Sequence, residues 1–444
     1  MSDPRVTVHV RSGGDAPLRQ GWVVFVTGKL ERLSRKVARA LHDRTFGPKL
    51  RRHVGSALYV PAVSIALDRA LPPADRRLDL TTGFRDHRGA AQERRCSEAA
   101  LDRLAVAFRL AEADRDQSCP PQLAVRGLWA EWLDIHYQPL RAALRKGDLV
   151  ALRRLFENLH REPMSTGVGG TVDDLKAMPR PVAHAYYRSL WCRYRDLLES
   201  VRPDWSDVAS PIVGNPVGAW IDGRLVQLET LRHAHHATVL LDLLSDTAAP
   251  RILEVGGGMG GQAFQCLALG KSRVTYTIVD LPEVASLAGY CLLAALGEDQ
   301  VRLFGETTRQ NPLVEVLPHW RITDVEASSA DMVFNAHSFS EMDGASATFY
   351  LGQIERLDTR FFYHINHETR FCYRTPDGGQ SVNRVGSEMV PSKAAFRLVS
   401  RKPQLFIRPE NTANKGFAYL YERRQGAGGI SPSQKSGTST QVAT

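Results

Sequence analysis

The chain has 444 residues, of which 43% are apolar and 24% charged, and its formal net charge is +9. This length predicts two or three structural units, and the composition is that of an ordinary soluble protein. No apolar run approaches the roughly 18 residues that a membrane span needs, and no charged-then-apolar leader opens the chain. The six cysteines are scattered without a C-x-x-C pair. This spacing argues against a zinc knuckle or a disulfide scaffold, and we expect a cytoplasmic protein.

The positive charge is concentrated in the first 70 residues, as in "GKLERLSRKVARALHDR" and "KLRR". A basic stretch of this kind raises nucleic acid as a partner. Because neither an aromatic-interleaved RNA-binding signature nor a zinc finger accompanies it, we interpret it as a solvated helix face and expect no nucleic-acid partner.

Composition and periodicity divide the chain into four parts. The first is a basic extension of helix and loop, with helical spacing at residues 30–44. The second is helical, with apolar residues on one face of "LVALRRLFENLH" and a second helix-length stretch at 182–201, which suggests a cap or a dimerisation region. The third carries the predicted sheet, and the fourth is a Gly/Ser/Thr-rich tail expected to be disordered. The expected boundaries are 1–110, 111–205, 206–424 and 425–444.

The third part begins with an amphipathic helix, expected over 224–245. Apolar runs of strand length then alternate with segments of helix length, which predicts a parallel, doubly wound α/β sheet. The last two runs are joined by a loop alone and predict an antiparallel hairpin at the sheet edge. The seven predicted strands are 251–255, 273–280, 300–305, 330–336, 361–366, 396–400 and 416–422.

A glycine-rich loop, "RILEVGGGMGGQ", follows the first of these strands. Two cofactor classes fit its spacing. Gly256, Gly258 and Gly261 read G-x-G-x-x-G, the dinucleotide fingerprint. Gly256, Gly258 and Gly260, with Glu254 in front, read E-x-G-x-G-x-G, which is the S-adenosylmethionine pattern.

Other residues help to choose the cofactor. Asp280 ends the next strand and can accept both ribose hydroxyls, which either cofactor would supply. Glu254 places a carboxylate beside the loop, where a cationic methionyl group is favoured over a pyrophosphate. A helix precedes the first strand, and no Tyr-x-x-x-Lys pair follows the sheet. These features favour S-adenosylmethionine over a nicotinamide dinucleotide.

The motifs "LEVGGGMGG" and "IVDLPEV" resemble the class I S-adenosylmethionine-dependent methyltransferases. Within that class, "FNAHSFSEM" and "GNPVGAWIDGRLVQLETLRHAHHATVLLDLL" resemble a bacterial family of sugar O-methyltransferases found in natural-product and surface-glycan gene clusters. The resemblance spans roughly residues 125–423 and implies a seven-stranded Rossmann-like sheet preceded by a mainly helical region. It implies cofactor contacts from Glu254, Gly256, Gly257, Gly258, Gly260, Asp280 and Leu281.

Methyl transfer to a sugar hydroxyl benefits from a base at the carboxyl end of the fourth strand. His337 stands there, and plant small-molecule O-methyltransferases carry a base histidine in the corresponding motif. We therefore expect His337 to be the general base, with Glu341 orienting it or binding substrate, although a purely structural histidine remains an alternative. His364 and His367 follow on the fifth strand and are further candidates for contact with substrate.

Two more cofactor contacts are expected, Glu306 near the adenine amine and Asn335 beside the methionyl group. No metal site is predicted. Glu341 and Asp343 would be the nearest oxygen ligands for Mg²⁺, but two loop carboxylates do not support one.

The sequence thus predicts a cytoplasmic O-methyltransferase that uses S-adenosylmethionine and acts on a small-molecule sugar or glycoside. Methylation of another small molecule, such as a phenol or polyketide hydroxyl, is the nearest alternative. A catalytically idle adenosyl-binding scaffold is a second, and an NAD-dependent oxidoreductase is a third. The acceptor sugar, the metal requirement and the oligomeric state, a homodimer included, stay open.

Overall fold

The structure is a computed structural model that describes residues 65–66, 68–169, 175, 178–208, 210–271, 273–307, 311–374, 379–406 and 415–424. The chain divides into two compact units, Met1–Ala70 and Leu71–Thr444, of which the second contains the predicted sheet. The helix expected at residues 30–44 and the tail expected at 425–444 lie outside the described residues.

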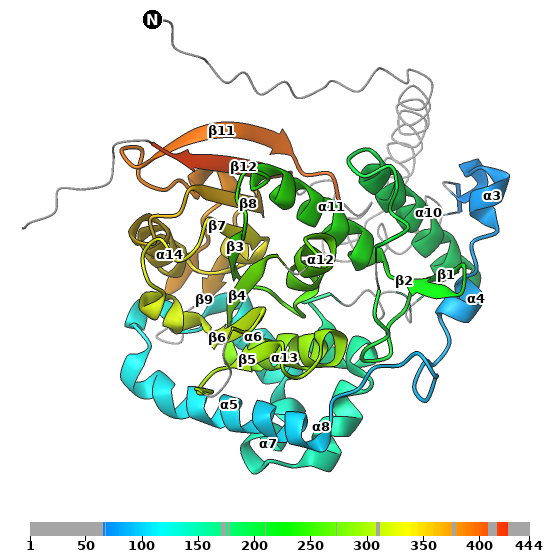
Figure 1. Ribbon diagram of the computed structural model, residues 1–444, viewed down its shortest axis with the longest axis horizontal. Helices are drawn as coiled ribbons and strands as arrows, with labels where there is room; N and C mark the ends of the chain where they lie inside the picture. Colours follow the sequence, from blue (N-terminus) through cyan, green and yellow to red (C-terminus); the bar gives the residue numbers. More distant parts are fainter. Residues whose placement is uncertain are drawn as a thin grey trace, which may run out of the picture. The chain divides into compact units, whose positions relative to one another are not determined.

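The second unit is built on an eight-stranded sheet with the order β11-β12-β8-β7-β3-β4-β6-β5 (Figure 1). All neighbouring pairs from β8 to β5 are parallel, and β12 runs antiparallel to both β8 and β11. This arrangement confirms the expected fold class, a mostly parallel, doubly wound α/β sheet with an antiparallel hairpin at its edge. The strands are β3 (Arg251–Val255), β4 (Thr275–Asp280), β5 (Val301–Leu303), β6 (Val314–Pro318), β7 (Met332–Ala336), β8 (Phe361–His367), β11 (Phe396–Pro403) and β12 (Gly416–Arg423).

The sheet has one strand more than the seven predicted. The extra strand is β6, which lies between β4 and the edge strand β5. Its five residues, "VEVLP", alternate buried and half-buried positions, so they lack the continuous apolar run by which the other central strands were recognised.

The start of the predicted helix 224–245 was also wrong. Arg224–Val226 forms strand β2, which pairs antiparallel with β1 (Ala219–Ile221). The turn between them places Asp222 and Gly223 at positive φ, which is the Asp-Gly signature of a tight hairpin. The helix itself, α11 (Leu228–Leu243), begins only after this hairpin.

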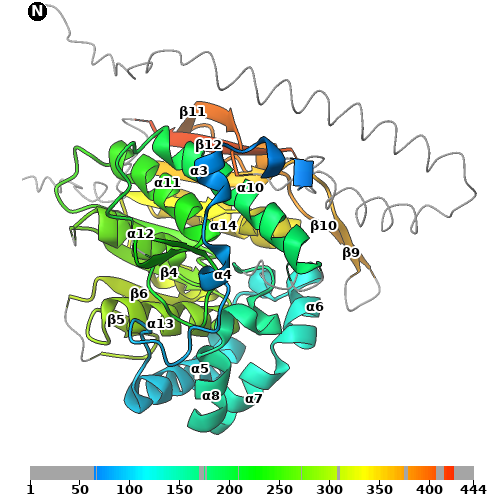
Figure 2. The ribbon, with the colours of Figure 1, turned by 90° about the vertical axis from the view of Figure 1, so that its right-hand side faces the viewer.

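Helices cover both faces of the sheet. Successive strand residues point to opposite sides, so each strand contributes to the core on each face. Ile252 of β3 belongs to a core shared with α12 (Gly261–Leu269), α13 (Pro282–Leu296), α11 and the amino-terminal helices. Its neighbour Leu253 belongs to the opposite core, shared with α14 (Gly344–Arg356). The helices α10, α11 and α12 lie side by side in both views (Figures 1 and 2).

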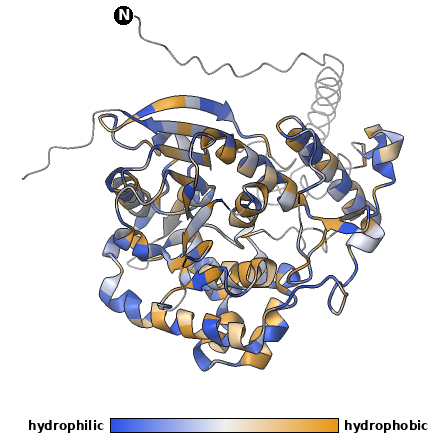
Figure 3. Cartoon of the chain, in the orientation of Figure 1, coloured by the Kyte–Doolittle hydropathy of each residue, from blue (hydrophilic) through white to orange (hydrophobic). Residues whose placement is uncertain are grey.

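The region before the sheet is mainly helical, as expected. Ser97 and Asp148 cap the first turns of α5 and α8 through their side-chain oxygens. Helix α5 carries both hydrophobic and hydrophilic residues (Figure 3) and runs across the boundary expected at residue 110. Helices of this region are α3 (Pro73–Arg76), α4 (Leu80–Gly83), α5 (Glu98–Ser118), α6 (Gly127–His136), α7 (Gln138–Lys146), α8 (Leu149–Phe156) and α10 (Arg180–Glu199).

Short elements complete the described chain. They are the hairpin β9 (Cys372–Arg374) and β10 (Gln380–Val382), and the 3-10 turns η1 (Pro121–Leu123), η2 (Leu159–Arg161), η3 (Pro163–Ser165), η4 (His319–Asp324), η5 (Ser338–Glu341) and η6 (Gly386–Glu388). Over the ranges that the structure describes, no helix combines the length and the apolar character needed to cross a membrane.

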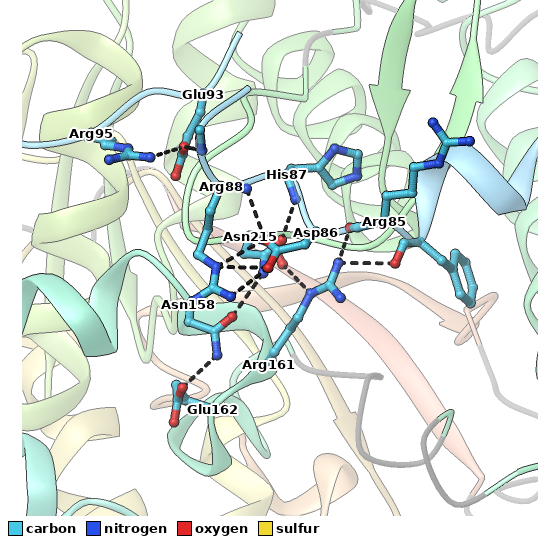
Figure 4. A network of polar contacts seen from close by, with 12 residues as sticks. Arg85, Asp86, His87, Arg88, Glu93, Arg95, Asn158, Arg161, Glu162 and Asn215 are labelled. Atoms are coloured by element: carbon cyan, nitrogen blue, oxygen red, sulfur yellow. Dashed lines mark hydrogen bonds and ion pairs between the residues drawn. The ribbon is translucent and has the colours of Figure 1, made fainter. Parts of the chain in front are cut away.

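The amino-terminal region is fastened to the rest of the unit by specific contacts. Phe156 stacks on Tyr290 of α13 with ring centroids 4.6 Å apart. Arg161 donates to the carbonyl oxygens of Asn215, Phe84 and Arg85, within the polar network of Figure 4. These contacts join segments that are far apart in sequence, so the helical region and the sheet form one structural unit.

Candidate functional site

A cavity of about 560 Å³ opens at the carboxyl ends of β3, β4 and β7. In an open α/β sheet this edge, where the strand order reverses, is the usual position of a ligand site. The cavity walls come from the glycine loop, one face of α11, helix α6, residues Thr166–Gly169 and the segment that follows β7.

The glycine loop forms the base of the cavity. Gly256, Gly258 and Gly260 all have positive φ, at 78°, 58° and 74°, a conformation that glycine adopts without strain. A Cβ placed on Gly256 would lie 2.3 Å from Ser338 Oγ, so this position has no room for a side chain. Gly256, Gly257 and Gly258 line the cavity, whereas Gly260 forms the amino-terminal cap of α12 behind them.

Asp280 holds the loop in place from the end of β4. Its Oδ2 accepts a hydrogen bond from the Gly258 backbone at 2.9 Å, and its Oδ1 accepts one from the Leu281 backbone at 2.8 Å. A carboxylate has about four acceptor positions, so further hydrogen bonds can be accepted. Burial raises the pKa of Asp280 to about 7. Asp280 and Leu281 both line the cavity.

Glu254 lies in the cavity wall with only 3% of its surface exposed. The Tyr276 hydroxyl donates to its Oε2 at 3.0 Å. Burial raises the pKa of Glu254 to about 8, so the carboxyl is protonated at neutral pH. A cation bound beside it would favour the ionised form and lower that pKa.

His337 lies where β7 ends, facing the same cavity. Its backbone has φ 71° and ψ −36°, a sparsely populated conformation for a residue with a side chain. Its backbone N–H donates to Ile365 at 2.7 Å, and its Nε2 lies 3.4 Å from Gln404 Nε2. Burial, with a contribution from the charge of Arg232, lowers the pKa of His337 to about 3 and keeps the imidazole neutral.

Glu341 lies in the cavity wall one short turn after His337. Its Oε2 accepts a hydrogen bond from the indole N–H of Trp129, on α6, at 3.1 Å. Burial raises the pKa of Glu341 to about 7. Among the described residues it is therefore Trp129, and not His337, that is hydrogen-bonded to this carboxyl group.

The other residues expected in the site divide into two groups. His367 lines the cavity, and its Nδ1 accepts from the Thr369 backbone at 3.2 Å. His364 is fully buried on the opposite side of β8, stacked on Tyr419 with centroids 4.8 Å apart. The side chain of His364 therefore belongs to the core.

Asn335 and Glu306 also lie outside the cavity lining. Asn335 is fully buried and donates to the Val255 carbonyl at 2.8 Å, which ties β7 to the glycine loop. Glu306 forms an ion pair with Arg103 of α5 at 2.6 Å. Neither placement supports direct contact with a cofactor.

Several lining residues were not predicted from the sequence. Trp129 and Trp132 come from α6, with ring centroids 5.4 Å apart at an interplanar angle of 70°. Arg232 comes from α11 and Gln404 follows the edge strand β11. They lie far from the glycine motif in sequence, and only the tertiary fold brings them to it. Their one sequence signal is the pair of tryptophans three residues apart on a helix.

Nothing in the described part of the chain groups three or more His, Cys, Asp or Glu residues in a way that could hold a metal ion.

No family model matches the chain, and no curated protein matches it. Solved structures do. The 1,6-didemethyltoxoflavin-N1-methyltransferase of Burkholderia thailandensis, with bound 1,6-didemethyltoxoflavin and S-adenosylhomocysteine, is 18% identical, with 43% of this chain and 78% of that chain covered and a TM-score of 0.28. The N-terminal domain of EvdMO1, in the presence of S-adenosylhomocysteine and D-fucose, is 10% identical, with 43% and 82% covered and a TM-score of 0.31. A SAM-dependent methyltransferase from Aquifex aeolicus is 14% identical, with 42% and 88% covered and a TM-score of 0.25.

Proposed function

We propose that the protein is an S-adenosylmethionine-dependent O-methyltransferase that methylates a hydroxyl group of a sugar, as a glycoside or an activated sugar. One observation carries the proposal. A single cavity joins the glycine loop, the buried carboxyls of Glu254 and Asp280, and His337 at the end of the next strand in the sheet.

The cofactor-binding residues fit an adenosyl ligand with a cationic end. Gly256, Gly257 and Gly258 line the cavity without side chains, so a ligand can approach their backbone closely. Asp280 is held by two backbone N–H groups and can still accept from ribose hydroxyls. Glu254 offers a carboxyl to a positive charge. When bound, S-adenosylmethionine supplies a methyl group on a sulfonium sulfur.

His337 is the proposed general base. Its imidazole is neutral at neutral pH and can accept the proton that the acceptor hydroxyl loses. Its strained backbone fits a residue held in position for function. Glu341, facing the same space and fixed by Trp129, is proposed to bind the acceptor through its carboxyl oxygens.

The sugar acceptor is supported by the part of the cavity wall that α6 contributes. Trp129 and Trp132 offer broad apolar faces beside the carboxyl group of Glu341. A sugar ring presents C–H groups on its faces and hydroxyls on its edge, so it matches a wall that combines aromatic faces with a hydrogen-bond acceptor.

A phenol or polyketide hydroxyl is the second candidate, because other aromatic residues line the same cavity. Phe334, Phe371, Phe406 and Tyr194 also line the cavity, and aromatic rings there would suit a flat aromatic acceptor. Both candidates use the same cofactor and the same base.

Titration calorimetry with S-adenosylmethionine and with NAD tests the cofactor. We expect binding of S-adenosylmethionine alone, and tight binding of NAD alone would overturn the proposal. Methyl transfer from labelled S-adenosylmethionine to a panel of glycosides, nucleotide sugars and phenols then tests the acceptor. Transfer to phenols alone would select the second candidate, and absence of transfer throughout the panel would favour an idle adenosyl-binding scaffold.

A further inference from the structure

One face of helix α11 lines the cavity with charged and polar side chains. Glu229, Arg232, His233 and His236 are spaced i, i+3, i+4 and i+7, so they lie on one side of the helix. An amphipathic helix packed on a sheet ordinarily turns apolar residues inward. Four polar residues that face a cavity need hydrogen-bond or charge partners, either from a polar ligand or from one another.

Arg232 lies at the glycine-loop end of this face. A Cβ placed on Gly261, at the start of α12, would lie 2.5 Å from His233 Nδ1, so this part of α11 packs against the end of the loop. The charge of Arg232 contributes to the lowered pKa of His337 and, at Glu254, opposes part of the rise in pKa that burial causes. The Arg232 side chain lines the same cavity as the glycine loop and His337.

The contacts of Arg232 do not use all of the N–H donors of its guanidinium group. Its Nη2 pairs with Glu229 Oε2 at 2.7 Å and lies 3.4 Å from His233 Nε2. Its Nε has no hydrogen-bond partner among the described residues. A guanidinium carries five N–H groups in a planar fork that suits a carboxylate. About a quarter of the side chain, 23%, is exposed.

Arg126 is the other arginine in the cavity lining that the structure describes, which contains no lysine. It precedes α6 and lies 3.7 Å from Asp343, on the side of the cavity formed by Trp129. Of the two cationic side chains, Arg232 is the one near the glycine loop.

We infer that Arg232 binds the α-carboxylate of the methionyl group of S-adenosylmethionine, with Glu229 holding the guanidinium in place. The inference rests on the proposed function, because it names a contact to the proposed cofactor. It also completes the charge pattern of the site, since Glu254 meets the positive end of the ligand and Arg232 meets its negative end.

Decarboxylated S-adenosylmethionine differs from the cofactor by this carboxylate alone and gives a direct test. Calorimetric titration of the full-length protein and of its Arg232→Met variant with both ligands separates the carboxylate contact from every other contact. For S-adenosylmethionine we expect the variant to bind about 10- to 100-fold more weakly, as for loss of a charged hydrogen bond. For the decarboxylated ligand we expect no more than a twofold change.

Arg145→Met, at an arginine outside the cavity lining that pairs with Glu112 and is 53% exposed, is the matched control and should change neither affinity. Equal weakening of both ligands by Arg232→Met, or no weakening of either, overturns the inference while the cofactor assignment stands. If the wild-type protein binds neither ligand, the proposed cofactor fails and the inference fails with it. Retained binding of the decarboxylated ligand shows that the variant is folded. If Arg232→Met does not fold, Arg232→Lys gives the same comparison with a smaller selective loss, and an equal effect on both ligands would again overturn the inference.

Discussion

At the scale of single residues, the candidate site is governed by burial. Three carboxyl groups in the cavity wall, Glu254, Asp280 and Glu341, have raised pKa values, and His337 has a lowered one. Each shift has desolvation as its largest cause, so burial moves each group towards its neutral form. A cationic ligand would favour the ionised form of the carboxyl groups, and an acceptor hydroxyl could give its proton to neutral His337.

His337→Ala tests the proposed base. Removing a general base should lower kcat by about 10²- to 10⁴-fold, whereas the dissociation constant for S-adenosylmethionine should change little. The measurement is steady-state methyl transfer at saturating cofactor, together with calorimetry. His367→Ala serves as the comparison, and a larger loss of kcat from that variant than from His337→Ala would assign the base to His367.

The buried carboxyl of Glu254 predicts a pH dependence of stability. Its pKa is raised from 4.5 to about 8, so the folded state keeps a proton that the unfolded chain releases above pH 4.5. The stability that this group contributes is therefore full at acidic pH and is lost as pH rises towards 8, with a slope of up to about 1.4 kcal/mol per pH unit. Denaturant unfolding of the wild-type protein and of Glu254→Gln between about pH 5 and pH 8 measures this contribution as the difference between the two slopes.

The amide of Glu254→Gln does not titrate, so the variant lacks the contribution of this one carboxyl to the pH dependence of stability. Asp280 and Glu341 contribute equally to both proteins. An unchanged slope in the variant would mean that Glu254 is ionised in the folded, ligand-free protein.

At the scale of elements, the sequence predicted what depends on local pattern. Long apolar runs identified every strand of the sheet except β6, and the glycine loop and Asp280 were placed at the correct strand ends. The short alternating strand β6 and the hairpin β1–β2 were missed, because their pairing partners decide their conformation more than their own residues do.

In the candidate site, too, the sequence predicted the residues whose position depends on local pattern. Apart from Gly260, the predicted motif residues line the cavity, since a glycine loop and a strand end have a fixed relation to the sheet edge. Asn335, His364 and Glu306 lie outside its lining. Tertiary packing decides which face of a strand is buried and which arginine pairs with a loop carboxylate, so the local sequence does not reveal either. Trp129 and Trp132 lie on a helix whose packing position no local pattern reveals.

Two glycine-to-alanine variants compare a loop with a helix. Gly256→Ala places a Cβ at positive φ and 2.3 Å from Ser338 Oγ, so we expect a loss of stability of about 1–3 kcal/mol. Gly352 is exposed on α14, and a Cβ placed there would have nothing within 4 Å, so Gly352→Ala should add about 0.5–1 kcal/mol. Urea unfolding of both variants measures the difference, and a neutral Gly256→Ala would contradict the described loop geometry.

At the scale of the whole second unit, the amino-terminal helices are part of the fold that carries the cavity. Arg103 of α5 pairs with Glu306 and donates to the carbonyl oxygens of Glu298 and Val301, at 3.0 and 2.9 Å. These bonds fasten α5 to the edge of the sheet next to β5. The helices therefore support the sheet as well as closing the cavity.

Arg103→Met should destabilise the protein by about 1–3 kcal/mol, because the half-buried carboxylate of Glu306 loses its ion-pair partner and two carbonyl groups lose the hydrogen bonds that Arg103 donates. Arg145→Met is the control. Arg145 pairs with Glu112 but has 53% of its side chain exposed, so its loss should cost less than about 1 kcal/mol. Thermal unfolding at one fixed pH compares the two, and equal effects would show that the α5 contacts do not hold the sheet edge.

The cavity lining comes from two separate parts of the chain, which can change independently as related proteins diverge. Trp129, Trp132 and Thr166–Gly169 come from segments before the sheet, whereas the glycine loop and Asp280 come from within it. Selection can therefore alter the shape of the part of the wall formed by α6 through substitutions or insertions there, while the part formed by the glycine loop and Asp280 stays constant. A library randomised at Trp129 and Trp132 alone would explore new acceptors on an unchanged cofactor platform.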